Sequence, residues 1–173
     1  MLKNRYLWLC LIAIISFVVV EACGVSYKFN NAKLDYSIYK TIAVADFPNQ
    51  APLVYPPLFQ EFNEKLKDAY SRQTRLQIVQ QNGDYNVSGA IVGYTLQQLA
   101  VGADGLSAQT SLIMTVRVEF SNNKNPQEDF SKTFSAHREF SSTSSFDAVQ
   151  GELCTQLVED IVDQIFNATV ASW

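Results

Sequence analysis

The segment from Leu112 to Phe120 limits the possible folds more than any other, because a large apolar residue occupies every second position. One set of alternate positions is apolar, and the other is more polar: Leu112, Met114, Val116, Val118 and Phe120 against Ile113, Thr115, Arg117 and Glu119. Successive side chains of a β-strand point to opposite faces of the sheet. The pattern therefore predicts a half-buried strand whose apolar face must be covered by other elements.

Four more segments are typical of strands. Thr41–Phe47 is a short apolar run rich in β-forming residues, and Leu76–Val79 is a second candidate. Tyr85–Leu99 has the length of a long strand. In Phe130–Phe140 the apolar residues again share one face: Phe130, Phe134, Ala136 and Phe140.

Two segments have the period of a helix. Leu58, Phe62 and Leu66 recur every fourth residue, and the Pro56–Pro57 pair before them suits a helix start, where a missing N–H costs least. The last segment repeats an apolar residue at the same spacing: Val149, Leu153, Leu157, Ile161 and Ile165. Ser144 and Asp147 before that stripe predict a capping box.

The predicted order of elements is therefore β-α-β-β-β-β-α. We expect an α+β fold of two layers, with a mainly antiparallel or mixed sheet of about four to five strands. Both helices should pack on one face of that sheet, because each has a single apolar stripe.

The N-terminus has the layout of a secretory signal peptide. Lys3 and Arg5 are followed by the apolar run Tyr6–Val20, and the small residue Ala22 precedes Cys23. A cysteine at that position resembles the lipobox of bacterial lipoproteins, in which the cysteine receives fatty acyl chains such as palmitate and becomes the first mature residue. A retained signal anchor, or an ordinary cleaved signal with an incidental cysteine, stays open.

These features divide the chain into three parts. We expect residues 1–22 to be the signal peptide, residues 23–37 a lipidated N-terminus and tether, and residues 38–173 a single domain. No aspartate follows Cys23, which favours the periplasmic side of the outer membrane, although sequence alone leaves inner-membrane sorting open.

Charge and cysteine content exclude some classes of protein. The net charge of −4 argues against a nucleic-acid partner, which would require a basic surface. Cys10 lies in the predicted signal peptide and Cys23 is the predicted acylation site, so Cys154 has no partner for an intramolecular disulfide.

Motifs for catalysis are missing from the sequence. His137 is the single histidine, and no nucleophile motif or metal-binding spacing accompanies it. Gly89 and Gly93 lie within a strand pattern, which predicts a bulge or a close backbone contact instead of a phosphate loop. We therefore expect no enzymatic activity, no metal and no cofactor.

Three cations on neighbouring predicted strands are candidates for binding phosphate groups: Arg117, Lys132 and Arg138. Lys132 and Arg138 have the same side-chain parity as Phe134, which is awkward for a simple exposed patch. Solvated strand ends are the alternative interpretation of these cations.

The succession of motifs resembles the LptE family of lipopolysaccharide-assembly lipoproteins, in the form found in Bacteroidetes-type bacteria. The resemblance rests on the lipobox, Thr41–Phe47, the proline-led helix, Asp84–Tyr94, two long strands and a final helix. It implies an outer-membrane lipoprotein that plugs an LptD-type β-barrel and helps to deliver lipopolysaccharide to the outer leaflet. The partner surface should then be the polar face of the sheet, with the loops Gly102–Ser107 and Asn122–Asn125.

Other functions are compatible with the same residues. The chain could be another periplasmic interaction lipoprotein, such as an activator of cell-wall synthases or a CsgG-like secretion component. It could also carry lipid without a barrel partner, or be an enzyme that uses His137 as a general base.

Overall fold

The computed structural model describes residues 34–99 and 109–171. The predicted signal peptide, Cys23 and the loop Gly102–Ser107 lie outside the described residues. The described residues belong to one compact unit.

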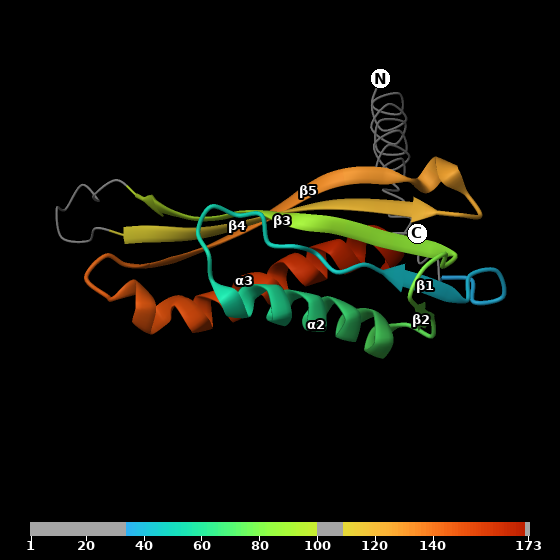
Figure 1. Ribbon diagram of the computed structural model, residues 1–173, viewed down its shortest axis with the longest axis horizontal. Coiled ribbons are helices and arrows are strands. Elements are labelled where there is room, and N and C mark those ends of the chain that lie inside the picture. Colours follow the sequence, from blue (N-terminus) through green and yellow to red (C-terminus); the bar gives the residue numbers. More distant parts are fainter. Residues whose placement is uncertain (1–33, 100–108, 172–173) are drawn as a thin grey trace, which may run out of the picture. The chain divides into compact units, whose positions relative to one another are not determined.

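A mixed sheet of five strands forms one layer of this unit, in the order β2-β1-β3-β4-β5 (Figure 1). The strands are β1 (Thr41–Val44), β2 (Gln77–Val79), β3 (Tyr85–Gln98), β4 (Gln109–Asn122) and β5 (Phe130–Ser141). β1 lies parallel to both β2 and β3, whereas β3, β4 and β5 are joined in antiparallel pairs. The predicted strands and the mixed sheet are therefore confirmed.

Two helices form the second layer, on one face of the sheet (Figure 1). These are α2 (Pro56–Gln73) and α3 (Phe146–Phe166), and α3 continues into a π-helical turn, η2 (Asn167–Ala171). A short 3₁₀ turn, η1 (Pro126–Glu128), connects β4 to β5. The predicted two-layer α+β fold is confirmed, as is the proline pair at the start of α2.

The predicted capping box at the start of α3 is wrong. The N-cap residue is Ser145, and its side chain makes no capping hydrogen bond. Ser144 lies in the turn that leaves β5, where its backbone N–H donates to the Ser141 carbonyl at 2.9 Å. A serine and an acid at the right spacing therefore do not form a cap here, because the turn takes the serine out of the N-cap position.

The core lies between the sheet and the two helices. The alternate residues of β4 predicted to be apolar are all at most 2% exposed, and the stripe of α3 from Leu153 to Ile165 is buried against them. Removing one such side chain from water stabilises the fold by roughly 1.5–3 kcal/mol. No helix in the described part of the chain is long and apolar enough to cross a membrane.

One buried amide ties α2 to the segment after β1. Asn63 is 5% exposed, and its Oδ1 accepts the Phe47 backbone N–H at 2.7 Å. Its Nδ2 donates to the Phe47 carbonyl at 3.3 Å and to the Phe59 carbonyl at 2.8 Å. This amide therefore satisfies backbone groups that the core would otherwise leave unpaired.

Both glycines of β3 have the structural role that the strand pattern predicts. The pairing with β4 shifts by one residue between Ile91 and Gly93, as in a β-bulge. At Gly89 an added Cβ would lie 2.5 Å from Cε1 of Phe47, so the aromatic ring needs a residue without a side chain there.

Candidate functional site

The face of the sheet opposite the helices is the candidate functional surface, and we call it the open face. Within the described residues no helix covers it (Figure 1). The register places on it side chains from β3, β4 and β5 that are exposed to solvent. These are Thr95, Gln97, Arg117, Glu119, Ser131, Thr133, Ser135, His137 and Glu139.

Small hydroxyl side chains dominate this surface. Thr115 and Ser135 face each other across β4 and β5 with their hydroxyl oxygens 3.2 Å apart, and the Ser135 hydroxyl also donates to the Met114 carbonyl at 3.1 Å. Formal charges on the open face come from Arg117, Glu119 and Glu139 in the part of the chain that the structure describes. The open face is therefore a polar surface with many hydrogen-bonding groups and little net charge.

The structure does not bring the three candidate cations together. Arg117 pairs with Thr133 on the open face, whereas Lys132 pairs with Val118 and Arg138 with Leu112 on the helix side of the sheet. Lys132 and Arg138 occupy alternate positions of β5 that point to the helix side, as their shared parity with Phe134 indicated. They therefore cannot form one patch with Arg117.

Arg138 is engaged in contacts within the fold. Its Nη2 lies 2.5 Å from Oδ2 of Asp160, its Nε donates to Oε1 of Gln156 at 3.1 Å, and its Nη1 donates to the His137 carbonyl at 3.0 Å. Asp160 and Gln156 belong to α3, so this arginine joins the edge strand to the helix layer. The sequence alone does not show that Arg138 lies close to Asp160 and Gln156.

Lys132 lies on the same side of β5 but has a different environment. Its Nζ is 4.6 Å from the centre of the Phe130 ring, a distance typical of a cation–π contact. Its side chain is exposed. Arg117 and Lys132 therefore remain accessible to an anionic ligand, on different faces of the sheet.

A polar network fixes the end of the domain where the predicted tether enters, and sequence reasoning did not find it. The Asp84 carboxylate accepts the backbone N–H of Lys40 at 2.7 Å and of Thr41 at 3.0 Å. Lys124 Nζ lies 3.0 Å from the other oxygen of Asp84 and also donates to the Ile38 carbonyl. Burial alone would raise the pKa of Asp84, but these donors outweigh it and lower the pKa to about 2.

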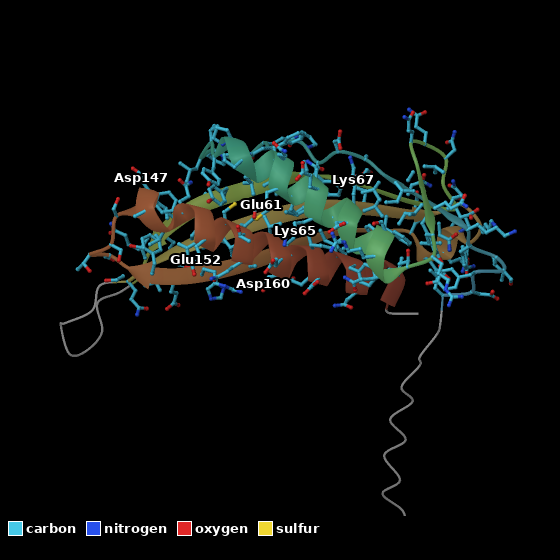
Figure 2. All side chains as sticks on the ribbon, turned by 90° about the horizontal axis from the view of Figure 1, so that it is seen from below. Glu61, Lys65, Lys67, Asp147, Glu152 and Asp160 are labelled. Carbon is cyan, nitrogen blue, oxygen red and sulfur yellow. The ribbon has the colours of Figure 1, made fainter. Side chains whose placement is uncertain are left out.

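The helix layer carries two open grooves lined mainly by charged residues. One, of 540 Å³, lies beside α2 and Ile78, and the other, of 320 Å³, lies between α2 and α3. Figure 2 shows the charged side chains of this layer, with Lys65 from α2 and Asp160 from α3 among those labelled. The three cations that line these grooves are ion-paired: Lys65 with Glu159 at 2.7 Å, Lys67 with Asp46 at 2.5 Å and Arg72 with Asp68 at 2.8 Å. The two grooves therefore offer little unpaired positive charge to an anionic ligand.

The groups with catalytic potential do not form a site. His137 is exposed on the open face, and no group of three metal-ligating side chains occurs in residues 34–99 and 109–171. Burial raises the pKa of the Cys154 thiol to about 12, so this cysteine is protonated and a poor nucleophile at neutral pH.

Comparison with known proteins gives one family. A family model described as LptE, lipopolysaccharide-assembly, matches residues 39–169. No curated protein sequence matches the chain significantly.

Comparison with solved structures finds likenesses at low sequence identity. A Xanthomonas campestris protein is 11% identical with a TM-score of 0.57, over 77% of this chain and 85% of its own. A minor lipoprotein from Acinetobacter baumannii is 16% identical with a TM-score of 0.49, over 74% and 90% of the two chains. Rare lipoprotein B from Shewanella oneidensis is 14% identical with a TM-score of 0.42, over 72% and 91%. At such identities the first of these likenesses supports the fold and nothing more specific.

Proposed function

The chain belongs to the LptE family of lipopolysaccharide-assembly proteins, and we propose that it acts as a lipid-anchored plug and assembly partner of an LptD-type β-barrel. The family role is lipopolysaccharide assembly. The β-barrel partner, the docking surface and the location in the outer membrane are proposed here. The protein would stabilise the barrel by docking and would make no covalent bond of its own.

The polar character of the open face is the main support for this proposal. The helices cover one face of the sheet (Figure 1), and that face is buried in the core. The other face presents hydroxyl, amide and a few charged groups to solvent. The interior of an outer-membrane barrel is polar. A surface with many hydrogen-bonding groups and only a few charges can dock against such a wall through polar contacts.

We also propose that Cys23 carries the lipid anchor and that the domain works on the periplasmic side of the outer membrane. Several acyl chains on one residue bind a membrane far more firmly than a single chain. Replacing Cys23 with alanine should release the protein into the soluble periplasmic fraction. Retention in the membrane with an unmodified cysteine would contradict the anchor.

For lipopolysaccharide we propose contacts with Arg117 and Lys132, because both side chains are exposed. Arg138 was the third candidate, and its guanidinium already has partners on α3 and β5. Arg117→Ala and Lys132→Ala should each weaken capture of lipopolysaccharide by the purified protein, whereas Arg138→Ala should weaken it less. Equal loss in all three variants would contradict this assignment.

Recovery of the partner from envelope extracts tests the proposed function directly. Thr133→Trp adds bulk at the centre of the open face, and Glu152→Trp adds the same bulk to the exposed surface of α3. We expect the wild-type protein and Glu152→Trp to bring down a large β-barrel, and Thr133→Trp to recover about tenfold less.

The alternatives predict other results in the same experiment. Recovery of a cell-wall synthase or of a homo-oligomeric ring, with no barrel, would contradict the proposal. A protein that binds lipopolysaccharide while remaining monomeric in the envelope would favour direct lipid carriage.

A further inference from the structure

The outer edge of β3 is paired along only part of its length. The segment after β1 follows this edge as far as Ile91, whose N–H donates to the Pro48 carbonyl at 3.0 Å and whose carbonyl accepts the Gln50 N–H at 2.8 Å. β3 continues to Gln98. Beyond Gly93, none of the described residues pairs with its outer edge.

The register shows which backbone groups point outward there. The Leu99 N–H donates to the Gln109 carbonyl at 2.9 Å, so Leu99 faces β4. In an antiparallel pair the N–H and C=O of a residue point to the same side, and successive residues alternate. The backbone groups of Thr95 and Gln97 therefore face β4, while those of Tyr94, Leu96 and Gln98 point away from the sheet.

The side chains beside this edge are uncharged, and two large apolar ones are exposed. Leu96 is 44% exposed on the helix side of the sheet, where it pairs with Leu112. Val54 is 74% exposed and precedes Tyr55, whose ring stacks on Tyr94 with 6.3 Å between centroids. No residue from Ile91 to Leu99 carries a formal charge.

The opposite edge of the sheet, along β5, carries charged side chains and has an outward carbonyl that is already hydrogen-bonded. There the outward carbonyl of His137 is already bonded by Arg138, which Asp160 holds in place. Lys132 and Glu139 add charges to the same strand. Charged side chains on an edge strand are a common means of preventing further strand pairing.

We propose that the outer edge of β3 from Tyr94 to Gln98 binds an extended segment of the barrel partner as an added strand. This inference rests on the proposed function, which supplies the partner. The alternating donors and acceptors of the edge are complementary to another extended backbone. The added strand would place an apolar side chain beside Leu96 and polar side chains on the open face, so that the sheet and the docking surface become continuous.

A proline substitution tests the backbone bonds. Leu96→Pro removes an outward donor and, because that N–H does not bond to β4, proline is tolerated as on other edge strands. Ile78→Pro is the matched control, because Ile78 lies on the edge strand β2, is 41% exposed, and lines the groove beside α2, away from the open face. The Gln77 N–H donates to the Lys40 carbonyl, so the next N–H, that of Ile78, points away from the sheet as that of Leu96 does. In full-length protein from envelopes we expect Leu96→Pro to reduce barrel recovery about tenfold and Ile78→Pro to leave it unchanged.

Leu96→Asp provides a second variant that keeps the backbone donor but places a charge beside the added strand. It should also reduce barrel recovery, and thermal unfolding of each variant shows that the domain is folded. Barrel recovery at the wild-type level in Leu96→Pro and Leu96→Asp would overturn the inference while the proposed function stands.

A photo-reactive residue placed at Gln98, with Ile78 as the control position, identifies the occupant. Crosslinks from position 98 to an extended segment of the barrel, and none from position 78, are the expected result. Crosslinks to a second copy of this chain, or to the barrel from position 78 alone, would overturn the inference. If the wild-type protein recovers no barrel at all, the proposed function fails, and the occupant proposed here fails with it.

Discussion

The two faces of the sheet are built by the same strands but have different chemical roles. On β4 the residues that face the helices, such as Val116 and Val118, have no exposed surface. Their neighbours Arg117 and Glu119 point the other way and are exposed. The buried face supplies the hydrophobic free energy of folding, and the open face contributes little to it.

This difference means that folding and docking can be changed separately. Substitutions on the covered face should lower the stability of the domain, whereas substitutions on the open face should change binding alone.

The largest effect is expected in the core between α3 and the sheet. Leu157 has no exposed surface, so Leu157→Ala should lower the free energy of unfolding by about 2–5 kcal/mol. Thr133→Ala, on the open face, should change it by less than about 0.5 kcal/mol. Chemical denaturation measures both, and equal losses would contradict the division between the faces.

A smaller loss is expected at the buried amide of α2. Asn63→Ala leaves the backbone N–H and carbonyl of Phe47 without their partners, which should cost about 1–3 kcal/mol. Gln60 is exposed and bonds only to Glu64, so Gln60→Ala is the control. A domain as stable as wild type after Asn63→Ala would show that water replaces these bonds.

The network at the predicted tether end should make stability depend on pH. The folded pKa of Asp84, about 2, lies below its ordinary value of 3.8, so its contribution is full above about pH 4 and is lost as the pH falls toward 2. Solvent screening limits the contribution to about 1 kcal/mol. Unfolding measured from pH 5 to pH 2 should show this loss in the wild type and not in Asp84→Asn, and parallel curves would contradict it.

The smallest expected effect is a difference in stability between variants of two arginines on opposite faces of the sheet. Arg138→Ala removes a partly exposed ion pair and should cost about 0.5–1 kcal/mol, whereas Arg117→Ala should cost almost nothing. The order of lipopolysaccharide capture should be the reverse, with Arg117→Ala the weaker binder. Thermal shifts with a capture assay on the same preparations test both statements.

Much of the fold could be predicted from periodicity. The alternation of β4 and the four-residue spacing of α3 correctly identified the buried side chains, because burial follows directly from the strand and helix periods. The open face followed from the same alternation. The location of β1 between β2 and β3, in parallel with both, depends on long-range pairing that no local pattern encodes.

The contacts of individual polar side chains were less predictable. Arg138 and Asp160 are far apart in the sequence, and their ion pair depends on how α3 crosses the sheet. Asp84 and Lys124 belong to separate turns that meet only at the end of the folded sheet. The capping box failed for a related reason, since the turn after β5 decides which serine precedes the helix.

Thiol labelling in intact envelopes tests the central claim, that the protein docks through its open face. Thr133→Cys reports on that face and Glu152→Cys on the helix layer, and the buried Cys154 thiol contributes little background. We expect position 133 to be protected from a bulky maleimide and to become reactive when the barrel is depleted, while position 152 stays reactive throughout. Protection at position 152 together with free labelling at position 133 would contradict it.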